Sequence, residues 1–154
     1  MECKQCKKIL VATDGSDNFG QAMSFALGLA KSSGAMVYTV YVVSNVSMYA
    51  GTRDVSWAES MNEHFFREGE TANNVVIEEG KAHGVEVKAE ILEGNPGEEI
   101  LDFAEANDID MIAMGTKGGS GVNRFLLGSV AEKVVRHSKV PVLVVPNDAA
   151  CIVP

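Results

Sequence analysis

The chain alternates short apolar runs with longer amphipathic runs, and this alternation restricts its fold more than any other feature. The five apolar runs have the length of β-strands and cover residues 8–13, 35–43, 85–91, 111–114 and 142–145. Between them, apolar residues recur at three- and four-residue spacing, as they do in helices that pack by one face. Such alternation predicts a single-domain α/β fold, in which a five-stranded parallel sheet carries helices on both faces.

Glycines are expected to end the first two helices. Gly34 and Gly84 each follow an amphipathic run, at the position where a residue with positive φ commonly ends a helix. The second helix is expected over residues 57–83, after a loop over residues 44–56 that is rich in polar residues. The apolar residues that fall near helical spacing in this second helix are Met61, Phe65, Ala72, Val75 and Val76.

Capping patterns predict where the last two helices begin. Asn95-Pro-Gly-Glu98 has an N-cap residue, then proline at the first helical position, then glutamate three residues after the cap. Ser129-Val-Ala-Glu132 repeats the capping-box pattern. The residues of this last helix that are expected to face the core are Ala131, Val134 and Val135.

The third strand differs from the others in its pattern. Over residues 85–91, Val, Ala and Ile alternate with Glu and Lys. A strict period of two indicates one buried and one solvated face. This strand is therefore expected at an edge of the sheet.

Composition excludes several classes of partner. The chain of 154 residues carries a formal net charge of −8, and no basic cluster is longer than Lys7-Lys8. Because phosphate contacts from Lys and Arg supply most of the affinity for nucleic acids, neither nucleic acid nor an anionic membrane is an expected partner. No apolar run reaches the roughly 20 residues that span a bilayer, and the N-terminus lacks a signal-peptide core. The expected location is the cytoplasm.

Three cysteines do not form a disulfide framework or a complete zinc site. Cys3 and Cys6 have the spacing of half a zinc site or of a redox pair, but no second pair of ligands follows at a suitable distance. They also precede the first strand, whereas a thioredoxin-like pair follows a strand and opens a helix. We expect Cys3, Cys6 and Cys151 to be reduced thiols, with no metal site.

Residues 115–130 form a glycine-rich link between an expected strand and an expected helix. Their spacing is Gly115-x2-Gly118-x9-Gly128-Ser129. Loop amides beside a helix N-terminus favour a phosphate group, and glycine lets the backbone approach it closely. The pattern is neither a P-loop nor the dinucleotide-binding fingerprint. From the spacing alone, a nucleotide-binding loop and a flexible connection both remain open.

These residues, together with four segments along the chain, resemble the nucleotide-binding subgroup of the universal stress protein family. The family signature is Gly-x2-Gly-x9-Gly-[Ser/Thr], and the similarity extends through residues 9–16, 108–115, 127–137 and 141–146. It covers nearly the whole chain and is weakest over residues 44–70 and the terminal extensions. The resemblance suggests a domain over residues 8–146, an N-terminal extension over 1–7 and a C-terminal tail over 147–154.

The resemblance implies a Rossmann-like sheet of strand order 3-2-1-4-5, similar to that of the adenine nucleotide α-hydrolases, with ATP held where the order reverses. Carried over by position, the residues implied at the phosphates are Gly115, Gly118, Gly128, Ser129 and Val130. Those implied at the nucleoside end are Asp14 and Val42, with the main chain around Ala12 and Thr13. A Mg²⁺ or Mn²⁺ ion bridging the phosphates is also expected, because Mg²⁺ usually borrows substrate oxygens and keeps waters.

Three charged residues near this expected site have two interpretations each. Lys117 is expected to add positive charge at the phosphates, and Arg124 is a second candidate. Both are equally well explained as solvated loop cations. Asp14 is expected to hold the nucleoside, although an aspartate is also a common turn residue ahead of a helix.

The last strand suggests a second copy of the chain as a partner. Residues 142–145 are apolar on both faces, and the implied strand order puts them at an edge of the sheet. An exposed apolar edge promotes aggregation unless another strand covers it. Pairing of Val142–Val145 with the same strand of a second subunit covers it with two-fold symmetry, and the family resemblance implies the same homodimer.

The sequence favours a regulatory binder over an enzyme. Hydrolysis of ATP needs an oriented water and charge stabilisation at the γ-phosphate. The glycine-rich loop offers no clear general base and no Walker-type aspartate for a metal. We therefore expect an ATP-binding protein of the stress response. The alternatives are a slow ATPase, an autophosphorylating enzyme, or a binder of AMP or cyclic AMP.

Overall fold

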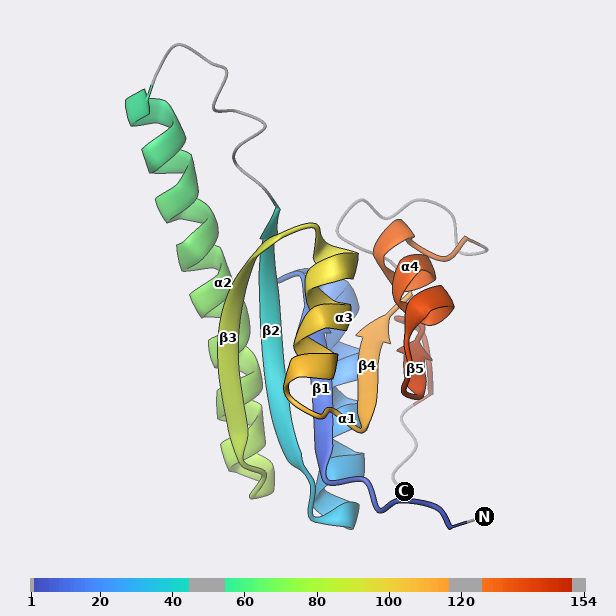
Figure 1. The fold of residues 1–154 in the computed structure, drawn as a ribbon. Coiled ribbons are helices and arrows are strands. Elements are labelled where there is room, and N and C mark those ends of the chain that lie inside the picture. Colours follow the sequence, from blue (N-terminus) through green and yellow to red (C-terminus); the bar gives the residue numbers. More distant parts are fainter. Residues whose placement is uncertain (1, 45–54, 117–125, 151–154) are drawn as a thin grey trace.

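The computed structural model (Figure 1) describes residues 2–44, 55–116 and 126–150, and these residues form one parallel sheet with helices on both faces. The order of the strands is β3-β2-β1-β4-β5, and every neighbouring pair is parallel. The strands are β1 (Lys8–Thr13), β2 (Met36–Ser44), β3 (Val87–Gly94), β4 (Met111–Gly115) and β5 (Val142–Val145). The predicted fold class and strand order are thereby confirmed.

Four α-helices and one short 3-10 helix connect the strands in the described part of the chain. They are η1 (Asp17–Phe19), α1 (Gly20–Ser33), α2 (Val55–His83), α3 (Pro96–Ala106) and α4 (Ser129–His137). Helices α1 and α2 cover one face of the sheet, and α3 and α4 cover the other (Figure 1). Each face has its own cluster of buried apolar residues, so the sheet is covered on both sides.

Strand β1 lies at the centre of the sheet, between β2 and β4. Its residues Ile9 and Val11 pack into the cluster under α1, whereas Leu10 packs into the cluster under α3 and α4. All three side chains are fully buried. A strand buried on both faces requires a continuous apolar run, which is what residues 8–13 show.

Most of the predicted helix boundaries are confirmed. Gly34 and Gly84 follow α1 and α2 with φ angles of 73° and 69°, a backbone conformation that glycine adopts without a Cβ penalty. The Oδ1 atom of Asn95 accepts a hydrogen bond from the backbone N–H of Glu98 at 3.3 Å. Asn95 is thus the N-cap of α3, with proline at the first helical position. The loop expected over residues 44–56 lies mostly outside the described residues.

The predicted capping box of α4 is wrong. Gly128, in extended conformation, is the N-cap, and Ser129 is the first helical residue, without a capping hydrogen bond from a side chain. The Gly128 N–H donates to the carbonyl of Thr116 at 2.7 Å, while the Gly128 carbonyl accepts from Glu132 N–H at 2.9 Å. Val135 is also not an inner residue, because 46% of its surface is exposed. The buried stripe of this short helix contains only Ala131 and Val134.

Helix α2 carries a second departure from the expected apolar face. Val75 is 50% exposed, and Asn73 is buried instead, with 3% of its surface exposed. The Asn73 side chain accepts a hydrogen bond from the Thr39 hydroxyl at 3.0 Å and donates to the Glu90 carbonyl at 3.0 Å. A polar side chain therefore joins α2 to both β2 and β3 in the interior.

The segment before β1 is fixed to the sheet by one carboxylate. Asp110 Oδ2 accepts hydrogen bonds from the backbone N–H groups of Lys7 and Lys8 at 2.9 and 3.0 Å, and Asp110 Oδ1 pairs with Lys4 Nζ at 2.6 Å. Burial alone would raise the pKa of the Asp110 carboxyl, but these hydrogen bonds outweigh burial and lower that pKa. An ionised Asp110 thus anchors residues 4–8 at the start of β4.

Candidate functional site

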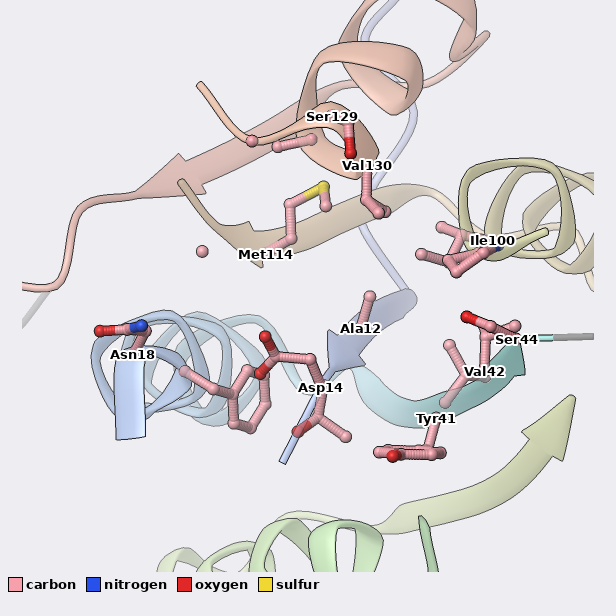
Figure 2. A pocket seen from close by; sticks show the side chains of 17 residues that line it. Ala12, Asp14, Asn18, Tyr41, Val42, Ser44, Ile100, Met114, Ser129 and Val130 are labelled. Atoms are coloured by element: carbon pink, nitrogen blue, oxygen red, sulfur yellow. The ribbon is translucent and has the colours of Figure 1, made fainter. Parts of the chain in front are cut away.

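A cavity of about 320 Å³ opens at the carboxyl ends of β1, β2 and β4 (Figure 2). Strand β1 pairs with β2 on one side and with β4 on the other, so the strand order reverses at this point. In open α/β sheets, ligands bind in the crevice at such a reversal. Its described lining residues are Ala12, Thr13, Asp14, Asn18, Phe19, Val40, Tyr41, Val42, Ser44, Pro96, Ile100, Met114, Gly115, Gly128, Ser129, Val130 and Ala131.

The structure brings most of the sequence-predicted site residues to this one cavity. Those that line it are Ala12, Thr13, Asp14, Val42, Gly115, Gly128, Ser129 and Val130. They come from the ends of β1, β2 and β4 and from the N-terminus of α4, elements that are far apart in sequence. Lys117, Gly118 and Arg124 lie outside the described residues.

Asp14 forms a turn, which is one of the two roles considered for it from the sequence. Its Oδ1 atom accepts hydrogen bonds from the backbone N–H of Ser16 at 2.9 Å and from the Ser16 hydroxyl at 2.6 Å. This is turn chemistry, and it fixes the carboxyl group at the mouth of the cavity. Among the described residues, Asp14 Oδ2 has no partner, so this oxygen can accept a hydrogen bond from a ligand.

The N-terminus of α4 faces the cavity and supplies backbone donors. The N–H groups of the first three helical residues, Ser129 to Ala131, have no intrahelical acceptor. The Gly128 N–H is different, because it is already bonded to the Thr116 carbonyl. Together with the exposed Ser129 hydroxyl, the three first-turn amides can donate to an anion, and the helix dipole favours that anion.

The rest of the lining is largely apolar and was not predicted from the sequence. Pro96 and Ile100 come from the first turns of α3, Val40 from β2 and Met114 from β4. Pro96 and Ile100 could have been predicted from the capped start of α3. A helix that follows a parallel strand begins at the edge of the sheet where that strand ends, which is the edge that carries the cavity. These residues give one side of the cavity an apolar wall.

Tyr41 is a further lining residue that sequence reasoning missed. Its ring lies between the cavity and α2, and its hydroxyl lies 3.5 Å from Glu68 Oε2. Burial raises the pKa of the Tyr41 hydroxyl, and the negative charge of Glu68 raises it further. The hydroxyl is therefore neutral and serves as a hydrogen-bond donor at neutral pH.

The described lining contains one carboxylate, that of Asp14, and no lysine or arginine. No group of three or more His, Cys, Asp or Glu side chains suited to a metal ion occurs in the described ranges. None of the helices in those ranges is both long and apolar enough to cross a membrane. Any anion held by the described lining is consequently met by neutral donors and a helix dipole.

A parallel sheet of order 3-2-1-4-5, with a cavity at the reversal and a helix N-terminus facing it, defines a Rossmann-like α/β protein with a cavity at the place where this class of fold binds ligands. The sequence model of the universal stress protein family matches residues 5–146. A relative from Methanocaldococcus jannaschii, universal stress protein MJ0531, is 44% identical over 140 residues, which are 90% of this chain and 81% of the relative. The chain belongs to the universal stress protein family.

Solved structures show the same fold. The structure of the hypothetical protein MJ0577 is similar with a TM-score of 0.82 at 28% identity, over 96% of this chain and 100% of that one. A universal stress protein from Archaeoglobus fulgidus, solved in complex with dAMP, is similar with a TM-score of 0.67 at 24% identity, over 92% of this chain and 98% of that one. The second likeness concerns the fold alone.

Proposed function

We propose that this protein binds ATP in the cavity at the strand-order reversal and acts as a nucleotide-dependent regulatory protein of the stress response. The observation that carries the proposal is the position of the first turn of α4, whose free amides and Ser129 hydroxyl face a cavity with an apolar wall. A volume of about 320 Å³ lies within the usual range of ligand pockets, about 300–1,000 Å³. The dAMP complex of a protein of the same fold makes adenine nucleotides the ligands to test first.

The distribution of polar and apolar groups gives the ligand an orientation. Gly115, Ser129 and the α4 amides lie on the β4 side of β1, whereas Val42 and Ser44 lie on the β2 side. Anionic phosphates suit the first side, because donors and the helix dipole are there. The base and ribose suit the second side, where Val42 and the α3 wall are apolar and Asp14 can accept from a ribose hydroxyl.

A divalent cation fits this arrangement when it is bound together with the nucleotide. Mg²⁺ usually takes one or two protein carboxylates and completes its shell with phosphate oxygens and water. In the described lining, the Ser129 hydroxyl is an oxygen donor on the phosphate side, and phosphate oxygens and water would supply the remaining ligands. The metal would neutralise phosphate charge, which no described basic side chain of the lining does.

The proposed activity is binding rather than rapid hydrolysis. Among the described lining residues, the Asp14 carboxylate already accepts two hydrogen bonds within its own turn, and no histidine or second carboxylate lies beside it to orient a water. Efficient attack on a γ-phosphate needs such a group. A single-turnover experiment with labelled ATP distinguishes binding from catalysis. A slow ATPase would release phosphate, and an autophosphorylating enzyme would become labelled. Either signal should be lost in Ser129→Ala.

ATP with Mg²⁺ is expected to stabilise the protein against heat. At a free ATP concentration 100 times the Kd, binding adds about 2.7 kcal/mol to the free energy of unfolding. For a chain of this size, that corresponds to a rise in Tm of roughly 5–10 °C. Thermal unfolding with ATP, AMP and cyclic AMP, each with and without Mg²⁺, measures the preference.

Chromatography of nucleotide released by denaturing the purified protein is an independent check on ligand identity. The absence of released nucleotide, together with an unchanged Tm for all three ligands, would contradict the proposal. A rise in Tm with AMP or cyclic AMP but not with ATP would show that one of these nucleotides, and not ATP, is the ligand. The proposed binding site would be unaffected by that result.

We also propose that the protein is a homodimer that pairs through β5. Strand β5 is an edge strand of the described sheet, and its residues Val142, Leu143 and Val144 are only partly buried. The backbone of Ile112 donates to the carbonyl of Pro141 at 3.0 Å, and Ile112 lies opposite Val142. In a parallel ladder this register directs the N–H of Val144 away from β4 and toward the free edge.

Val144→Pro is therefore expected to convert the dimer to a monomer without breaking the β4–β5 ladder. Proline removes the outward N–H group and is tolerated in an edge strand at such a position. Sedimentation equilibrium of wild type, Val144→Pro and the control Val144→Thr, which keeps the N–H, measures the effect. A monomeric wild type at micromolar concentration, or an unchanged dimer in Val144→Pro, would show that β5 is not the interface.

A further inference from the structure

The side chain of Asn18 lines the cavity but has no structural role in the described part of the chain. It lies in η1, between β1 and α1, and is partly buried. No hydrogen bond of the described residues involves its amide, and neither η1 nor α1 has a side-chain cap. Polar side chains at such turns usually bond to the nearby backbone, as Asp14 does with Ser16. The Asn18 amide is left for another partner.

The topology puts Asn18 on the same side of β1 as the end of β4. The 3-10 helix that carries Asn18 contacts β4, the strand that ends at Gly115. Figure 2 shows Asn18 and Ser44 at opposite ends of the cavity, with Ala12 and Asp14 between them. Asn18 therefore borders the end at which Gly115 and the α4 amides meet, and not the β2 end.

Within the described lining, phosphate oxygens at this end can meet only neutral donors. The described lining has no lysine or arginine, and Asp14 contributes a negative charge. The Gly128 N–H is used by Thr116, which removes one amide from the set of donors. The Asn18 amide supplies two further N–H donors to the same end of the cavity, and they come from η1 rather than from α4.

We propose that the Asn18 amide donates a hydrogen bond to a phosphate of the bound nucleotide and thereby favours phosphorylated ligands over the unphosphorylated nucleoside. This inference rests on the proposed function and assigns to one side chain the discrimination between phosphorylated and unphosphorylated ligands. A hydrogen bond to a charged acceptor is stronger than one to a neutral acceptor. Asn18 is thus a specificity-determining residue and not a nucleoside contact.

Calorimetric titration of adenosine, AMP, ADP and ATP, with Mg²⁺, into wild type, Asn18→Ala and Asn18→Asp tests this assignment. For Asn18→Ala, the Kd of ATP is expected to rise about tenfold or more, the loss of one charge-assisted hydrogen bond. For Asn18→Asp, the loss is larger and increases along the series AMP, ADP, ATP, because a carboxylate repels each added charge. The Kd of adenosine stays within about twofold in all variants.

Gln21→Glu is the matched control, because it makes the same amide-to-carboxylate change one helical turn later, outside the lining of the cavity. It is expected to bind every ligand as wild type does, which separates a direct contact from a change in net charge. Equal losses for adenosine and ATP in Asn18→Asp, or no loss for ATP in Asn18→Ala, would overturn the assignment. A wild type that binds none of the four ligands would instead overturn the proposed function, and the assignment with it.

Discussion

Replacement of Ser129 by aspartate is expected to abolish ATP binding while leaving the fold at least as stable as that of the wild type. Ser129 is the first residue of α4 and is exposed at the cavity. A carboxylate in the first turn of a helix interacts favourably with the helix dipole, by about 0.3–1 kcal/mol. The same carboxylate repels a phosphate about 5 Å away by about 3 kcal/mol at an effective dielectric constant near 20. The Kd of ATP should therefore rise at least about 100-fold.

The experiment is specific because the Ser129→Asp change should weaken ATP binding while it stabilises the fold. Calorimetric titration with ATP in the absence of divalent cations measures the repulsion of the phosphates, and urea denaturation without nucleotide measures the gain in stability. Ser129→Ala loses only a hydroxyl donor and is expected to bind ATP about tenfold more weakly. Ser24→Asp introduces the same aspartate on the exposed side of α1, away from the cavity, and should bind ATP as wild type does. Tight ATP binding by Ser129→Asp would mean that the phosphates do not lie at α4.

The arrangement of the site was predictable where strand ends determine it. Parallel strands all end at one edge, so residues directly after β1 and β4 had to meet if those strands were neighbours. Asp14 and Gly115 accordingly border one cavity. Neighbouring positions for β1 and β4 followed from the family resemblance, because alternation alone leaves several strand orders open. Helix caps that depend on local residues, such as Asn95, were predictable for the same reason.

Residues positioned by packing between distant elements were not predictable. The pattern Ser-x-x-Glu at 129–132 is locally consistent with a capping box, but the hydrogen bond from Gly128 to Thr116 shifts the cap by one residue. Asn18 was not among the predicted site residues, and the contact of η1 with β4 brings it to the cavity. Tyr41 alternates with apolar residues of a buried strand, so nothing in its spacing marks it as lining a site.

Helix α2 shows the same limit for the core. Helical spacing suggested Val75 for the apolar face, yet Val75 is half exposed and Asn73 is buried between α2 and the sheet. A polar residue is admitted to the interior only when its hydrogen bonds are satisfied there. The partners, Thr39 and the Glu90 carbonyl, come from β2 and β3, which lie 34 and 17 residues away in sequence.

Replacement of Asn73 by leucine is expected to reduce the free energy of unfolding by about 2–4 kcal/mol. Leucine has a similar size and a higher helix propensity, so the loss does not come from a cavity or from the helix. It comes from the Thr39 hydroxyl, which is fully buried and loses its acceptor, and from the Glu90 carbonyl, which loses a donor. Urea denaturation at a fixed protein concentration measures the change.

The double variant Thr39→Val/Asn73→Leu tests whether the loss arises from unpaired polar groups. Removing both side-chain partners of a buried hydrogen bond leaves neither of them unsatisfied, and it costs less than removing one. We therefore expect Thr39→Val to lower stability by about 1–2 kcal/mol alone, but to raise the stability of the Asn73→Leu protein by about 1 kcal/mol. The Glu90 carbonyl stays unpaired in the double variant, so recovery is incomplete. Strictly additive losses would mean that Asn73 acts through packing and that the Thr39 hydrogen bond contributes little.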